Sequence, residues 1–92
     1  MKRLVEILGV DEETIRGLVG KIPTPKIRKV IELRFGLKDG MERTLKDVSE
    51  EMKINMELVR QFEARGLRFL RNNLTKKKSL VEIIKSFFRS RG

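Results

Sequence analysis

Arg60 and Gln61 are the residues of this chain best suited to specific recognition chemistry. They lie one turn into an amphipathic stretch that begins after Asn55, on its polar side. An arginine guanidinium can donate two hydrogen bonds to guanine O6 and N7, and a glutamine amide can pair in the same bidentate way with adenine N6 and N7. A carboxylate such as Glu57, in the preceding turn, can accept a hydrogen bond from cytosine N4. These residues indicate a helix that reads base edges, although an ordinary exposed helix face would show the same residue types.

Further cations surround this group. They are Arg65, Arg68 and Arg71 on the same stretch, and Arg43 and Lys46 at the start of the stretch before it. Phosphate contact is favoured for the later arginines, because only the N-terminal part of such a helix lies deep in the groove. The two earlier cations can reach a DNA backbone. Thr44, between them, could donate its backbone N–H to a phosphate at a helix N-terminus, but a plain N-cap would explain this residue equally well.

Two helices joined by a tight turn are predicted over residues 44–71. Thr44 can cap the first helix, and Asp47 three residues later can close a capping box. Residues 53–54 are too few to form more than a turn. Asn55 is a favourable N-cap for the second helix. This arrangement is helix-turn-helix geometry, in which the second helix lies in the major groove.

Helices are also expected on both sides of this motif. Apolar spacing and cap residues predict short upstream helices within residues 2–35, the last of them capped by Thr24 with Pro25 at its first position. Downstream, residues 72–75 are expected to end the long helix. A shorter final helix is expected over residues 79–89, opened by an S-x-x-E capping box.

These elements indicate one all-α domain over residues 1–92. No stretch alternates with period two, and the sequence has no internal repeat and no glycine-rich phosphate loop. We therefore expect a small bundle of five or six helices that contains the helix-turn-helix. The apolar stripe of the final helix suits closure of a small core, and a membrane-surface role is the less favoured alternative.

Composition excludes several classes of function. The 92 residues include no Cys and no His, so thiol chemistry, imidazole catalysis and His-based metal sites are excluded. We expect neither a metal nor another cofactor, and no residue spacing suggests an enzyme. No apolar run is long enough to span a bilayer and no secretory signal is evident, so we expect a cytoplasmic protein without membrane contact.

The net charge of +9 is unevenly distributed along the chain. Residues 1–52 hold 11 Lys or Arg against 10 Asp or Glu, whereas residues 53–92 hold 11 against 3. Such a local excess of cations on and beyond the candidate recognition helix is typical of proteins that bind a polyanion. A basic face that serves only solubility is the alternative.

Residues 22–90 resemble the promoter-reading C-terminal domain, region four, of housekeeping-type bacterial RNA polymerase sigma factors. The segments RFGL, RTL, VRQ and EAR occur in order and at compatible spacing, which a generic helix-turn-helix would not reproduce. The resemblance implies that Glu57, Arg60 and Gln61 face the −35 element of a promoter. It also implies that Arg65 lies near promoter-bound activators, so activators or anti-sigma factors are further candidate partners.

The same resemblance implies docking on the RNA polymerase core. In the family, the helices ahead of the motif help to form an apolar cleft that grips the flap-tip helix of the β subunit. The matching candidates here are Ile27, Ile31, Leu33 and Phe35. For any single one of them a place in the core is the favoured explanation, because apolar side chains at helical spacing are usually buried.

Met56 and Leu58 depart from the family, which usually carries arginines for −35 contact at these positions. Neither side chain can donate a hydrogen bond to guanine or phosphate, so recognition of the usual −35 hexamer is in question. The chain could recognise a different hexamer, with one of these residues against thymine methyl groups. It could instead bind DNA weakly and depend on tethering to polymerase, or the pair could contact a protein. A tolerated surface substitution without a role in binding would also explain the pair.

We therefore predict a sequence-specific DNA-binding module of transcription initiation that recognises the −35 element and docks on the β-flap. The alternative is a sigma-like interaction module that binds the β-flap or a transcription regulator, with weak or altered DNA specificity. The chain has no room for the regions that bind the rest of polymerase and melt the −10 element. We expect it to be either a domain cut from a sigma factor or a stand-alone sigma-like protein.

Overall fold

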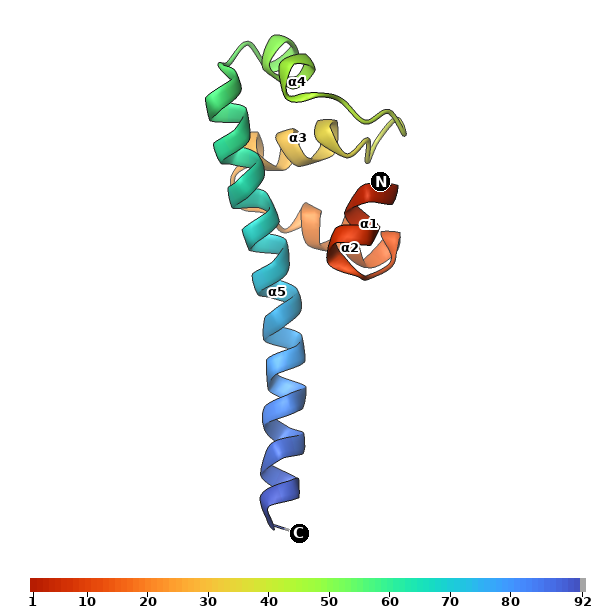
Figure 1. The fold of residues 1–92 in the computed structure, drawn as a ribbon, viewed down its shortest axis with the longest axis vertical. Coiled ribbons are helices and arrows are strands. Elements are labelled where there is room, and N and C mark those ends of the chain that lie inside the picture. Colours follow the sequence, from red (N-terminus) through yellow and green to blue (C-terminus); the bar gives the residue numbers. More distant parts are fainter. Residues whose placement is uncertain (92) are drawn as a thin grey trace.

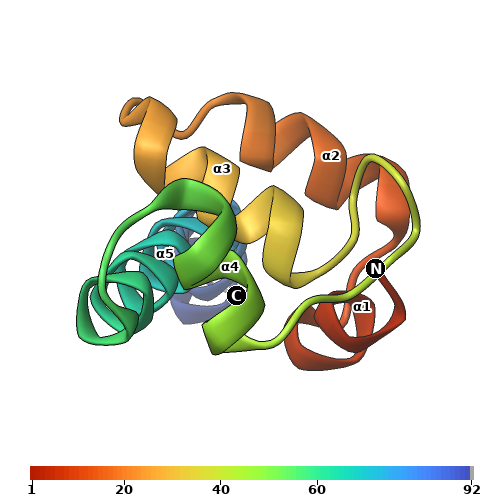
Figure 2. The same ribbon diagram turned by 90° about the horizontal axis from the view of Figure 1, so that it is seen from above.

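Five α-helices and no strand make up residues 1–91 in the computed structural model, which describes the backbone of those residues and the side chains of residues 1–74. The helices are α1 (Lys2–Leu8), α2 (Glu12–Gly20), α3 (Pro25–Arg34), α4 (Leu45–Met52) and α5 (Met56–Arg91). Figure 1 shows α1–α4 along the first half of α5, whose second half extends past them. Seen from above, α1–α4 are gathered to one side of α5 (Figure 2). The prediction of an all-α helix-turn-helix fold is confirmed.

Local capping sets the ends of the two helices of the motif. The Asp47 backbone N–H donates to Thr44 Oγ1 at 3.1 Å, and the Thr44 N–H donates to Asp47 Oδ2 at 3.3 Å, which completes the predicted capping box at the start of α4. Lys53 ends α4 in the left-handed conformation, with φ 56°. Asn55 Oδ1 then accepts from the Leu58 N–H at 2.7 Å, which confirms it as the N-cap of α5.

The C-terminal part of the chain differs from the sequence expectation. Helix α5 continues without interruption from Met56 to Arg91, so neither an end at residues 72–75 nor a separate helix over residues 79–89 is present. No Gly or Pro occurs after Gly66 within α5, and Asn73 Nδ2 donates to the carbonyl of Phe69 at 2.8 Å instead of ending the helix. The predicted core-closing stripe falls on side chains outside the described residues.

The core of the described residues consists of two groups of apolar side chains joined at α5. The larger group lies under α1, α2 and α3 and includes Leu4, Ile15 and Leu70, each fully buried. The smaller group joins α3, α4 and α5 through Val30, Val48 and Val59, which are also fully buried. Phe62 of α5 packs against both groups. Helix α5 therefore packs against the core with one side and exposes its other side to solvent.

Gly66 allows α5 to approach α3 closely. A Cβ atom at this position would lie 2.6 Å from Ile31 Cγ1 and 3.2 Å from Ile27 Cγ2. Carbon atoms pack favourably only at about 3.5–4.0 Å, so no larger residue fits without moving α3 or its side chains. The glycine found inside this helix is thus explained by packing and not by backbone conformation.

No helix among the described residues combines the length and the apolar character needed to cross a membrane.

The packing at Gly66 predicts the effect of one added methyl group. We expect Gly66→Ala to lower the free energy of unfolding by about 1–2 kcal/mol, because overpacking outweighs the gain of about 1 kcal/mol in helix propensity. Gly17→Ala is the matched control, because a Cβ there meets no atom within 4 Å. Urea unfolding followed by circular dichroism should show the control to be as stable as the native chain or more so. A stabilised Gly66→Ala variant would contradict the packing argument.

Candidate nucleic-acid interface

One side of α5 is solvent-exposed from its first residue to residue 72. The exposed residues are Met56, Glu57, Arg60, Gln61, Ala64, Arg65, Arg68, Arg71 and Asn72. The residues between them, such as the buried Val59 and Leu70, face the core. Arg60 and Gln61 therefore lie on the outer side of the helix, where a duplex can approach them.

This exposed face is strongly basic. It carries four arginines, and Glu57 is its only acid between residues 56 and 72. Glu57 Oε2 lies 3.9 Å from Arg60 Nη1, with the two side chains 66% and 68% exposed. An exposed pair of this kind contributes little stability, so Arg60 can exchange the carboxylate for another acceptor. Farther along, Gln61, Ala64, Arg65 and Arg68 line a shallow hollow.

The start of α4 offers fewer free groups than the sequence suggests. Thr44 and Lys46 are both exposed. The backbone N–H of Thr44, for which phosphate contact and a plain N-cap were equally good explanations, donates to Asp47 Oδ2 within the capping box. The structure therefore favours the N-cap role for Thr44, and it leaves Lys46 as the cation at this end of α4 that extends into solvent.

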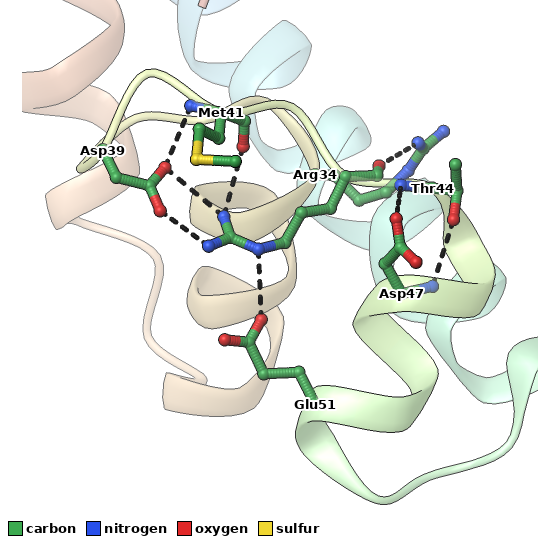
Figure 3. Close-up of polar contacts among 7 residues, drawn as sticks. Arg34, Asp39, Met41, Thr44, Asp47 and Glu51 are labelled. Atoms are coloured by element: carbon green, nitrogen blue, oxygen red, sulfur yellow. Dashed lines mark hydrogen bonds and ion pairs between the residues drawn. The ribbon is translucent and has the colours of Figure 1, made fainter.

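Arg43 is bound within the protein by two carboxylates (Figure 3). Its guanidinium lies 2.6 Å from Asp39 Oδ2 and 3.2 Å from Glu51 Oε2, and its Nη1 donates to the Met41 carbonyl at 3.2 Å. The side chain is only 22% exposed. Arg43 thus connects the segment between α3 and α4 to the outer side of α4, and little of its hydrogen-bonding capacity is left for DNA.

The same contacts shift the acidity of the pair. The hydrogen bond from Arg43 holds the pKa of the Asp39 carboxyl below its ordinary value of 3.8, and the Met41 N–H at 3.0 Å lowers it further. Asp39 in turn raises the pKa of Arg43. Both groups are therefore charged whenever the fold is intact near neutral pH.

Arg34 of α3 contacts both Glu63 of α5 and the α3–α4 segment. Figure 3 shows the side chain of Arg34. Arg34 Nε donates to Glu63 Oε1 at 3.0 Å, and Arg34 Nη1 donates to the carbonyl of Arg43 at 2.6 Å. The two side chains are 14% and 15% exposed. Sequence reasoning missed this pair. A usable signal was present, because Glu63 is an acid on the core-facing side of a basic helix, where a charge needs a partner.

The expected partner-binding residues fall into two groups. Ile27, Ile31 and Phe35 are 9%, 0% and 1% exposed and belong to the larger core group, so in this structure they are not available to a partner. Leu33 and Leu58 are half-buried, and Leu33 packs against the smaller core group. Met56 is 47% exposed. The cleft expected from the first three residues is thus filled by their own packing.

Among the described residues, no cluster of three or more acidic, His or Cys side chains is arranged to hold a metal ion.

Comparison with known proteins gives a match to one family and several relatives. The family model for Sigma-70, region 4 matches residues 24–72. The chain is 49% identical over 55 residues to RNA polymerase sigma factor SigA of Clostridium acetobutylicum, an alignment that covers 60% of this chain and 15% of that protein. It is 37% identical over 60 residues to SigA1 of Synechococcus elongatus, an alignment that covers 65% of this chain and 15% of that protein. It is 44% identical over 59 residues to the RNA polymerase sigma-B factor of a Nostoc species, covering 64% and 18%.

The matched residues coincide with the part of the structure that builds the basic face. Residues 24–72 contain α3, α4 and the first turns of α5 through the last of its four exposed arginines. The chain spans only about 15–18% of the length of these relatives. The comparison therefore concerns one domain and not the whole of any relative.

The Arg34–Glu63 pair predicts a large effect from a small change. Glu63→Gln removes the negative charge and leaves the poorly exposed Arg34 without a carboxylate partner, so we expect a loss of about 1.5–3 kcal/mol of unfolding free energy. The matched control is Glu57→Gln, where the exposed pair should contribute less than about 1 kcal/mol. Urea unfolding measures both, and equal effects of the two substitutions would argue against a structural role for the Arg34–Glu63 pair.

The Asp39–Arg43 pair predicts a pH-dependent contribution to stability. Because the folded-state pKa of Asp39 is lowered, its contribution is present above the ordinary value of 3.8 and is lost as the pH falls through the folded pKa. Unfolding free energies of the native chain and Asp39→Asn should therefore differ near neutral pH and converge in acid. The same comparison in an Arg43→Ala background should show a much smaller change with pH. A constant difference at every pH would contradict this assignment.

Proposed function

This chain belongs to the Sigma-70 region 4 family, and from that membership we propose that it is a promoter-recognition module of transcription initiation. In this proposal it binds the −35 element of promoter DNA and docks on the flap of the RNA polymerase β subunit. The observation that carries the DNA-binding part is the exposed basic face of α5, with Arg60 and Gln61 on its outer side. The family is a regulatory one, so the proposed activity is binding and not catalysis.

The first turns of α5 supply specificity in this proposal. A recognition helix contacts base edges through its N-terminal residues, which here are Glu57, Arg60 and Gln61. Among the side chains that the structure describes, Arg60 is paired with an exposed carboxylate 3.9 Å away, which a guanine can replace. Glu57, once released, can accept from a cytosine amino group. Sequence readout thus comes from three adjacent side chains on one turn of helix.

Phosphate contacts supply affinity and orientation. Arg65, Arg68 and Arg71 follow the outer side of α5, and Lys46 stands at the start of α4. Such contacts release condensed counterions, so binding should weaken steeply with salt. Arg43 and Thr44 act differently in this proposal: their side chains fix the start of α4, and they influence DNA binding through the position of that helix.

Docking on the β-flap is proposed from family membership and is limited by the observed packing. Ile27, Ile31 and Phe35 are buried. A flap helix would therefore have to contact half-buried neighbours such as Leu33, or its binding would require a movement of α3. The second candidate function is an interaction module for the flap, an activator or an anti-sigma factor, with altered DNA specificity. The observation in its favour is the exposed Met56 at the reading end of α5.

Titration of the full chain with duplexes selected from a random pool tests the DNA-binding proposal. We expect the logarithm of the binding constant to fall steeply with the logarithm of salt concentration. Arg60→Ala should cost about 1–3 kcal/mol on the preferred sequence and relax specificity at one position. Arg68→Ala should instead weaken all sequences alike and reduce the salt slope by about 1.

Lys2→Ala is the control for these variants, because it removes an exposed cation from α1, far from the start of α5 (Figure 1). It should change the affinity little. A salt slope near zero, or an Arg60→Ala variant that binds like Lys2→Ala, would refute recognition of DNA by this face.

A further inference from the structure

Met56 places an apolar side chain at the end of α5 that the proposed function puts deepest in the groove. It is the first residue of the helix, and the Asn55 cap directly before it fixes where the helix begins. Its side chain is 47% exposed and lies on the same side of the helix as Arg60, one turn further on. An exposed thioether therefore stands beside the base-reading side chains.

The structure separates Met56 from Leu58, which the sequence alone could not do. Leu58 is half-buried, and the next residue, Val59, is fully buried in the core between α3, α4 and α5. The helix thus turns Leu58 toward the bundle and Met56 toward solvent. Of the two apolar residues near the start of α5, Met56 is the one with the greater exposure to an incoming ligand.

The surroundings of Met56 suit a groove better than an apolar protein surface. The other large exposed hydrophobic residues among the described side chains are Ile7 in α1 and Met41 in the α3–α4 segment, so each lies on a different element. The exposed residues beside Met56 and one turn further on are polar or charged, namely Asn55, Glu57 and Arg60. A docking patch for a protein would be expected to gather several apolar side chains, whereas a base edge offers one methyl group among polar atoms.

We propose that Met56 determines specificity by packing against the 5-methyl group of a thymine in the major groove. This inference rests on the proposed function, because it requires α5 to lie in the groove. Thymine is the only DNA base that presents a methyl group there, and apolar contact with it distinguishes T from C. The unbranched, polarisable Met side chain can adapt to that contact. The basic face from Arg60 to Arg71 supplies the complementary charge that holds the duplex in place.

Replacing thymine by deoxyuridine tests this contact directly, because the change removes only the methyl group. The full chain is titrated with its preferred duplex, selected from a random pool, and with duplexes in which each T in turn is replaced by dU. We expect one position where the native chain loses affinity by about fourfold, the effect of one buried methyl group. Met56→Ala should bind the T and dU duplexes equally at that position.

Two further variants sharpen the test. Met56→Leu restores an apolar side chain and should recover the T-over-dU preference, which a purely structural role of the helix start would not require. Met41→Ala, which truncates an exposed methionine outside α5, should leave the preference unchanged. Circular dichroism of each variant checks that its helix content matches that of the native chain.

The outcomes separate this inference from the function on which it rests. Salt-dependent binding with one methyl-sensitive position that disappears in Met56→Ala supports the inference. Salt-dependent binding without any methyl-sensitive position, or with one that Met56→Ala retains, overturns the inference and leaves the DNA-binding function standing. Absence of salt-dependent duplex binding by the native chain overturns both.

Discussion

The close contact between α3 and α5 at Gly66 sets the spacing between these two helices. Ile31 occupies the space that a side chain at Gly66 would take, and it is itself fully buried. Arg34 lies one turn after Ile31 on α3, and Glu63 lies one turn before Gly66 on α5. The spacing of the two helices therefore determines whether these charges meet at 3.0 Å. A larger residue at Gly66 would separate both the apolar surfaces and the ion pair.

Polar contacts connect the α3–α5 pair to the α3–α4 segment and to α4. Arg34 also donates to the carbonyl of Arg43, whose own side chain binds carboxylates of the α3–α4 segment and of α4. The segment is further held by Arg16, which donates to the Leu37 carbonyl at 2.6 Å, and by Gly36, where a Cβ would lie 2.8 Å from backbone atoms of Met41. These contacts hold α4 and α5 in fixed positions relative to α3 before any ligand binds.

Features that depend on neighbouring residues could be predicted from the sequence. The caps at Thr44 and Asn55 are such features, because donor and acceptor lie three residues apart. So is the exposure of Arg60 and Gln61, because helical periodicity alone separates the polar side of α5 from the apolar side. Residue types and their spacing were therefore sufficient to assign the basic face to specific residues.

Features that depend on distant residues could not be predicted in the same way. Arg34 and Glu63 are 29 residues apart, so the position of Glu63 indicates that it needs a partner but not which residue that partner is. Arg43 looked like a phosphate ligand because Glu51 becomes its neighbour only when α4 forms, although Asp39, four residues earlier, was a local partner that the sequence analysis did not assign. The expected helix end at residues 72–75 was wrong because Asn and Thr are weak helix formers but do not interrupt the backbone hydrogen bonds as Pro would.

The unbroken length of α5 gives the molecule a mechanical property. The helix contacts α3 at Gly66, with about 15 Å of helix before that point and about 38 Å after it at 1.5 Å per residue. Val59 and Leu70, on either side of Gly66, are both fully buried, so α5 is held over several turns and not at one point. The same core that orients the basic face therefore resists tilting of the whole rod.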